Sequence, residues 1–256
     1  MVYDFAFDIL EILIITLAIF MALTFVMVVM VTLRQEVLPG LYTWEESEDL
    51  SEHGRAFFDT ADGELGAAGF RPVGTYVLPE MPALCELRVY LSSDALVTVQ
   101  ALSIELQSRV LKNARETGYI IHSYFEDGHW LATTDMSSLP WDNPDWLSGS
   151  AVDKSAGVQA MLGHHRVRLD ALVAEGHKPV KIKASKLKEL NDKVEAGFFE
   201  HQHGNGLIKP KEEGRYGLTF KIALRCLANA FVSGGKRTGP RPLKAKELSF
   251  PRPSAS

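Results

Sequence analysis

The chain has 256 residues, of which 46% are hydrophobic and 23% charged, and its formal net charge is −5 at pH 7. This composition leaves ample material for a hydrophobic core in one large domain or two small ones. The two cysteines, Cys85 and Cys226, form no disulfide framework, and the acidic balance argues against a nucleic-acid partner.

The charge is divided unevenly along the chain. Residues 1–165 hold 8 Lys/Arg and 23 Asp/Glu, a net of −15, whereas residues 166–256 hold 19 Lys/Arg and 9 Asp/Glu, a net of +10. An acidic half and a basic half can attract each other in the fold, or they can present two different faces to partners.

A run of 22 uncharged residues, from Ile12 to Leu33, predicts a helix that crosses a membrane. At about 1.5 Å per residue it measures roughly 33 Å, which matches a hydrocarbon core of about 30 Å. Its three threonine hydroxyls can bond back to helix carbonyls. A cleaved signal peptide is disfavoured, because no Lys or Arg precedes the run, the apolar core is too long and no A-x-A site follows it.

The base that follows this run closely is Arg34, and none precedes it, so the positive-inside rule favours a cytoplasmic domain. The predicted division is a short N-terminal segment 1–11, a transmembrane helix 12–33, a linker 34–46, an α+β soluble domain 47–232 and a basic disordered tail 233–256.

Periodicity predicts the elements of the soluble domain. A helix over 47–68 is expected to be capped by Ser47 and to stop at Gly69. The period then changes towards 2, which predicts strands. The strands are expected over 70–79, 84–91 and 95–104, with a hairpin over 119–135, a loop over 136–153, and helices over 155–175, 184–203 and 216–232.

These elements predict the α+β fold class, with a single N-terminal transmembrane helix followed by a four- to five-stranded antiparallel sheet flanked by helices. Asp127-Gly128 is expected to form a two-residue turn, which would place Glu126 opposite His129 and His122 opposite Thr133.

Four histidines are weak candidates for metal ligands: His122, His129, His201 and His203. His201 and His203 would point roughly 200° apart on a helix, and His122 would lie about 13 Å along the strand from His129. Neither pair completes a three-ligand site, and no nucleophile elbow or phosphate-binding loop is present. We therefore expect no catalytic residue, no metal and no cofactor.

Two surfaces are candidates for binding a partner. The first is the loop with Trp141, Asp142, Asp145 and Trp146, since tryptophan is enriched at binding hot spots. The alternative is that both rings cover the sheet. The second is the amphipathic C-terminal helix with its basic tail, which suits an anionic membrane or an acidic partner, unless the helix is simply packed on the domain. This surface consists of Phe220, Lys221, Leu224, Arg225, Leu227, Phe231, Lys236 and Arg237.

The function that these features predict is that of a single-pass, membrane-anchored interaction or assembly protein without enzymatic activity. It would contact the lipid bilayer and present its α+β domain to a protein partner near the membrane. Two alternatives remain open. One is a membrane-bound, metal-dependent hydrolase that uses scattered His and acidic residues, and the other is a membrane-tethered sensor of a small ligand.

Overall fold

The structure is a computed structural model that describes residues 2–34, 36–37, 45–47, 49–78, 83–106, 115–136, 141–212 and 215–232. Its described residues form two compact units. We call them the anchor unit (the described residues within Met1–Leu38, Leu139–Trp141 and Gln202–Thr238) and the sheet unit (the described residues within Pro39–Ser138 and Asp142–His201). The predicted disordered tail lies outside the described residues.

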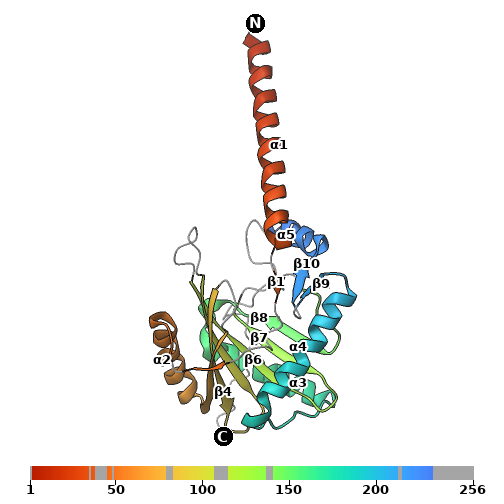
Figure 1. Cartoon of the computed structure of the whole chain (residues 1–256). Coiled ribbons are helices and arrows are strands. Elements are labelled where there is room, and N and C mark those ends of the chain that lie inside the picture. Colours follow the sequence, from red (N-terminus) through yellow and green to blue (C-terminus); the bar gives the residue numbers. More distant parts are fainter. Residues whose placement is uncertain are drawn as a thin grey trace. The chain divides into compact units, whose positions relative to one another are not determined.

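The anchor unit is built around a long apolar helix, α1 (Val2–Arg34), drawn in red in Figure 1. Its segment Leu13–Arg34 is the one helix of the described residues that is long and apolar enough to cross a membrane, with a mean hydropathy of 2.9 and 6% of that stretch buried. Thr24 Oγ1 donates to the carbonyl of Phe20 at 2.8 Å, so this hydroxyl is satisfied inside the helix, as predicted.

A small antiparallel sheet and a second helix complete the anchor unit. The order β1-β10-β9 joins β1 (Glu36–Val37) to β10 (Tyr216–Leu218) and β9 (Ile208–Pro210), and α5 (Phe220–Val232) follows. The prediction of one helix over 216–232 is therefore wrong at its start. Thr219 separates strand from helix, because its Oγ1 donates to Gly206 O at 2.7 Å and its carbonyl accepts from Ala223 N.

The sheet unit contains a mixed sheet of seven strands in the order β2-β3-β4-β5-β6-β7-β8. Neighbouring strands are antiparallel except β7 and β8, which are parallel. The strands are β2 (Glu45–Glu46), β3 (Phe70–Leu78), β4 (Ala83–Ser92), β5 (Thr98–Leu106), β6 (Arg115–Tyr124), β7 (Trp130–Thr134) and β8 (Leu147–Ala151).

The α+β class is thus confirmed, whereas the prediction of a purely antiparallel sheet with four to five strands is wrong. The missed strand β8 reads LSGSA, a short run of small residues without hydrophobic alternation. Its conformation depends on pairing with β7, from Trp130 with Leu147 to Thr134 with Ala151. The predicted loop 136–153 was consequently too long.

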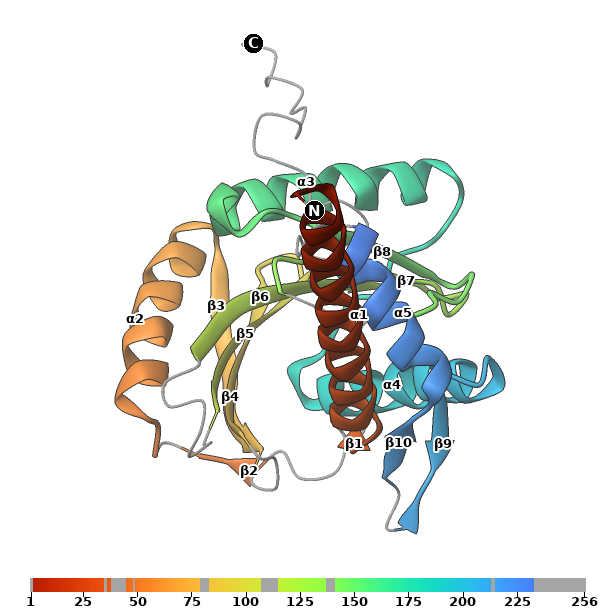
Figure 2. The ribbon, with the colours of Figure 1, turned by 90° about the horizontal axis from the view of Figure 1, so that it is seen from above.

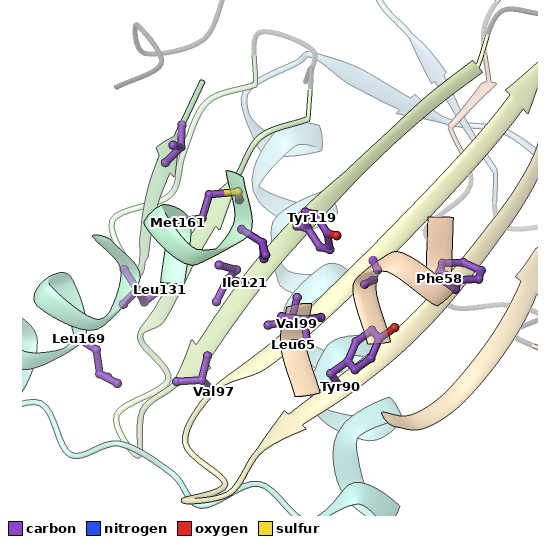
Figure 3. Packing of buried hydrophobic residues seen from close by; sticks show 14 of the residues in the cluster. Phe58, Leu65, Tyr90, Val97, Val99, Tyr119, Ile121, Leu131, Met161 and Leu169 are labelled. Atoms are coloured by element: carbon purple, nitrogen blue, oxygen red, sulfur yellow. The ribbon is translucent and has the colours of Figure 1, made fainter. Parts of the chain in front are cut away.

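Helices cover both faces of this sheet (Figure 2). On one face α2 (Glu52–Ala67) and α3 (Gly157–Ala174) bury the larger core. Figure 3 shows side chains of that core: Phe58, Leu65, Tyr90, Val97, Val99, Tyr119, Ile121, Leu131, Met161 and Leu169. On the other face α4 (Leu187–Gly204) packs through Leu187, with Leu190 and Val194 partly buried, against Leu87 and Val89 of β4. Short 3-10 turns, η1 (Lys154–Ala156) and η2 (Ala184–Lys186), precede α3 and α4.

The start of α2 differs from the prediction. Ser51, not Ser47, caps the helix, since its Oγ accepts from Gly54 N at 2.9 Å. Ser47 N instead donates to Thr75 O, which continues the pairing of β2 with β3. The carboxylate of Glu86, 1% exposed, accepts from Ser51 N at 2.5 Å and from Ser51 Oγ at 2.7 Å. A buried anion therefore stabilises the positive end of the helix dipole.

The hairpin between β6 and β7 has a three-residue loop rather than the predicted two-residue turn. Phe125 N donates to His129 O, Gly128 N donates to Phe125 O, and Gly128 has a φ of +84°. Three-residue hairpin loops commonly consist of a type I turn followed by a residue in the left-handed conformation, and Gly128 takes that last position. His122 therefore faces Ala132, and the predicted facing pairs of Glu126 with His129 and of His122 with Thr133 are wrong.

Candidate functional site

A stack of four aromatic rings lies on the sheet face that α4 covers. His122 and Tyr124 are two residues apart on β6, so their side chains lie on the same face of the sheet, and Tyr124 is paired with Trp130 of β7. The His122 ring lies 5.0 Å from the Trp130 ring with an interplanar angle of 2°, and 6.3 Å from Tyr124 with an angle of 10°. Trp146 extends the stack, 6.5 Å from Trp130. We call these four residues the aromatic stack.

The aromatic stack contains polar atoms that the fold buries without giving them partners. His122 is 4% exposed, and neither Nδ1 nor Nε2 has a hydrogen-bond partner among the described residues. Trp130 Nε1 is likewise buried and unpartnered there. A buried donor or acceptor without a partner lowers the stability of the fold by about 1–3 kcal/mol. The presence of these polar atoms in the aromatic stack therefore calls for an explanation other than stability.

The α4 layer brings further polar groups to the stack. The Tyr124 hydroxyl donates to Asn191 Oδ1, while Asn191 Nδ2 has no partner within the described chain. Burial raises the pKa of Tyr124, and the nearby Glu195 carboxylate raises it further. Burial lowers the pKa of His122 to about 3, so the ring is neutral at pH 7. This layer can therefore offer neutral donors and acceptors between flat rings.

On the opposite face a second buried histidine belongs to a closed hydrogen-bond chain. His165 of α3 lies 3.0 Å from Ser123 Oγ through Nε2 and 3.0 Å from Thr133 Oγ1 through Nδ1. Ser123 Oγ donates to Leu96 O at 2.9 Å, so its single proton points away from the imidazole. His165 Nε2–H must then donate to Ser123, and Nδ1 accepts from Thr133.

The chain continues from Thr133 to an arginine. Thr133 Oγ1 lies 3.2 Å from Ser150 Oγ, which accepts from Arg168 Nη1 at 2.6 Å. Burial lowers the pKa of His165 well below its usual value, with smaller contributions from His122 and Arg168. The Ser123 proton is donated to a carbonyl and no carboxylate orients His165, so this hydrogen-bond network lacks two parts of a hydrolase triad. The network joins α3 to the sheet.

The four histidines that the sequence singled out do not converge. His122 is enclosed in the aromatic stack, whereas His129 contacts Ser148 Oγ at 2.9 Å and lies 4.8 Å, ring to ring, from His177. At the end of α4, His201 is half-buried and His203 exposed, with the buried Gln202 between them. Within the described ranges no group of three or more His, Cys, Asp or Glu side chains could hold a metal ion.

The tryptophan loop is placed in part by its own contacts. Trp146 is half-buried, and its ring lies about 3.5 Å from the position a Cβ of Gly197 in α4 would occupy. Asp145 is exposed and Asp142 half-buried, and both precede β8 in the sheet unit. Trp141 is half-buried and belongs to the anchor unit. One tryptophan therefore helps to cover the sheet while an acid beside it faces water.

The surface of α5 keeps apolar side chains exposed. Phe220 is 49% exposed and Leu224 41%, and Lys221 is exposed with its Nζ 2.7 Å from Asn205 O. Arg225 is half-buried. The side chains of Leu227 and Phe231, together with residues Lys236 and Arg237, lie outside the described part.

Neither cysteine has the environment of an activated thiol. Cys85 is buried in β4, as expected for a small hydrophobic residue, and burial raises its pKa to about 11. Burial also raises the pKa of Cys226 on α5.

Sequence reasoning named His122 only as a weak metal ligand and did not select His165, although the burial of both histidines left a signal. His165 follows Val158 and Met161 and precedes Leu169 at spacings of 3, 4 and 4, which places it on the buried stripe of α3. His122 is two residues from both Ile120 and Tyr124 along β6 and so lies on the same face of the sheet as they do.

The chain matches no protein-family model, and no curated protein or solved structure shows detectable similarity to it.

Proposed function

We propose that the chain is a single-pass, membrane-anchored protein without enzymatic activity, which presents its sheet unit to a protein partner near the bilayer. The observation that carries the proposal is α1, an apolar helix of sufficient length whose side chains from Leu13 to Met27 are almost all exposed. Outside a membrane, such a surface would be an unusually large apolar patch. The bilayer is the solvent that suits it.

The absence of enzymatic activity is proposed from the arrangement of reactive groups. The described histidines and acids form no three-ligand group, and the Ser123 proton is directed to Leu96 rather than to His165. For the partner we propose the acidic rim of the tryptophan loop, because Asp145 is exposed there and Trp146 beside it is only half-buried. A basic segment of another protein suits this rim.

A photo-crosslinking residue in place of the exposed Asn143, which leaves both acids of the loop intact, tests this proposal in the full chain expressed in its native membranes. We expect an adduct of defined mass that a salt-washed membrane still yields, and a several-fold weaker adduct when Asp142 is also replaced by Asn. The matched control carries the same residue at Val167, an exposed apolar position on α3, and should give no such adduct. Recovery of the monomer alone from both variants would contradict the proposal.

A second candidate function, a membrane-tethered sensor of a small ligand, is favoured by the aromatic stack. The two His122 nitrogens and Asn191 Nδ2, which have no hydrogen-bond partner among the described residues, could bind a flat, uncharged molecule that carries both donors and acceptors. Stacking between rings would add about 1 kcal/mol per ring pair.

Native mass spectrometry of the full chain, released gently from its own membranes, distinguishes this candidate. We expect a bound species of constant small mass, lost in His122→Phe, which keeps the ring stack and removes both nitrogens. The control is Asn205→Ala in the anchor unit, which should retain the bound species. A bare protein mass in every preparation would argue against the sensor.

A further inference from the structure

We propose that α5 is an interfacial helix, with Phe220 and Leu224 inserted at the boundary between headgroups and acyl chains of the same bilayer that α1 crosses. This inference rests on the proposed membrane insertion of α1. The lipid surface, rather than an acidic protein partner, covers the exposed face of α5.

The depth of α5 follows from its contact with α1. Val29 of α1 packs on Ala223 of α5, and both are buried, at 9% and 0% exposure. Thr32, one turn further along α1, is also buried. Val29 precedes Arg34 by five residues, or about 7.5 Å along the helix axis. Ala223 therefore lies at the level of the last turns of the apolar segment.

The length of the apolar segment of α1 fixes the depth of α5 in the bilayer within narrow limits. The apolar residues from Leu13 to Leu33 extend over roughly 31 Å, which a hydrocarbon core of about 30 Å fills completely. Arg34 then lies at the headgroups, and Ala223 lies several ångströms towards the acyl chains. Interfacial helices bury their apolar face by about 5–10 Å at this boundary.

The side chains of α5 fall into a buried set and an exposed apolar set, as a helix at this depth requires. Ile222 and Ala223 are completely buried inside the anchor unit, whereas Phe220 and Leu224, four residues apart, are exposed on a shared side. Both lie within about 6 Å of Ala223 along the helix, so both reach the boundary. Figure 1 shows α5 in blue against the end of α1.

Charge complementarity supports lipid as the occupant. Lys221 is exposed beside Phe220, and its Nζ is held by the carbonyl of Asn205. Arg225 follows one turn later. A long basic side chain next to inserted apolar residues can keep its charge among anionic headgroups, which contributes about 1 kcal/mol for each Lys or Arg near the surface.

Depth-dependent fluorescence quenching tests the inference on the full chain. The protein carries Cys226→Ser, while buried Cys85 is left unlabelled. It is labelled with an environment-sensitive fluorophore at single cysteines and placed in nanodiscs of phosphatidylcholine and phosphatidylglycerol. One lipid bears a nitroxide near the headgroup end of its acyl chain. The labelled variants are Phe220→Cys, Leu224→Cys, Lys209→Cys and Phe20→Cys.

We expect roughly twofold quenching and a blue-shifted emission at positions 220 and 224, as interfacial insertion requires. The control at Lys209, exposed on β9 in the same unit, should be unquenched because β1 and its partner strands follow the end of α1. Since the discs contain no protein besides this chain and the scaffold protein at their rim, burial by a cellular partner cannot produce this signal.

Position 20, in the middle of α1 and 65% exposed, separates the two ideas under test. A blue-shifted label at 20, shielded from aqueous quenchers, with water-like emission at 220 and 224, overturns the interfacial helix while the anchor stands. A water-exposed label at 20 overturns the anchor itself. Leu224→Glu offers a second measurement, since it should leave folding unchanged and abolish the shift at 220.

Discussion

Replacing Gly54 by Ala should destabilise the sheet unit by about 2–4 kcal/mol, although the same change normally stabilises a helix. An added Cβ would lie 1.9 Å from Glu86 Oε2. The carboxylate is buried and held by two hydrogen bonds from Ser51, so it cannot move without losing both. Urea unfolding of the full chain in detergent, followed by the fluorescence of Trp130 and Trp146, measures the change.

The matched control lies nine residues further along α2. Gly63 is exposed, and an added Cβ there meets nothing within 4 Å, so Gly63→Ala should stabilise by about 0.5–1 kcal/mol. In a Glu86→Ala background, Gly54→Ala should lose most of its cost, because the obstacle is gone. Equal effects of Gly54→Ala in both backgrounds would show that the contact with Glu86 is not responsible.

Acid should begin to destabilise the sheet unit near pH 6.5, before the carboxylates of the unfolded chain start to protonate. In the folded state burial lowers the pKa of His122 to about 3 and that of His165 well below its usual value, whereas both return to about 6.5 when the chain unfolds. Below pH 6.5 the unfolded chain therefore binds more protons, and the free energy of unfolding falls by up to about 1.4 kcal/mol per pH unit for each histidine.

Between pH 6.5 and 4.5, His122 alone should remove roughly 2 kcal/mol of stability, and His165 adds to this loss in the same direction. His122→Phe should make this slope shallower by up to about 1.4 kcal/mol per pH unit and leave stability at pH 7 unchanged or higher, since it removes two nitrogens that have no hydrogen-bond partner among the described residues. Chemical denaturation at pH values from 7 to 4.5 measures both slopes. Identical slopes for the two proteins would exclude His122 as a source.

The sequence allowed prediction wherever a local pattern determines the structure. The apolar helix, the strands β3 and β4 and the hairpin around Gly128 all carry their own periodicity or turn residues. The strand β8 and the β9–β10 hairpin do not, because short runs of small or mixed residues become strands only when a distant partner is in place.

The candidate site was predictable to a lesser degree for a related reason. Nothing in the residues around His122 indicates that Trp146 and Asn191, which lie 24 and 69 positions away, come to the same face. The cap of α2 illustrates the same limit, since the anion that selects Ser51 rather than Ser47 is Glu86 on another element. Pairings across the sheet, rather than local preference, assemble these groups.

The pairing of β1 with β10 has a consequence for the order in which the chain matures. Glu36 pairs with Gly217 and Val37 with Tyr216, so the two strands are synthesised roughly 180 residues apart. At about 5–20 residues per second, the ribosome needs some tens of seconds or less to supply the second strand. During that interval α1 has no α5 beside it, while the sheet unit can already fold. The anchor unit is therefore completed last, and a truncated nascent chain leaves Val29 without its partner.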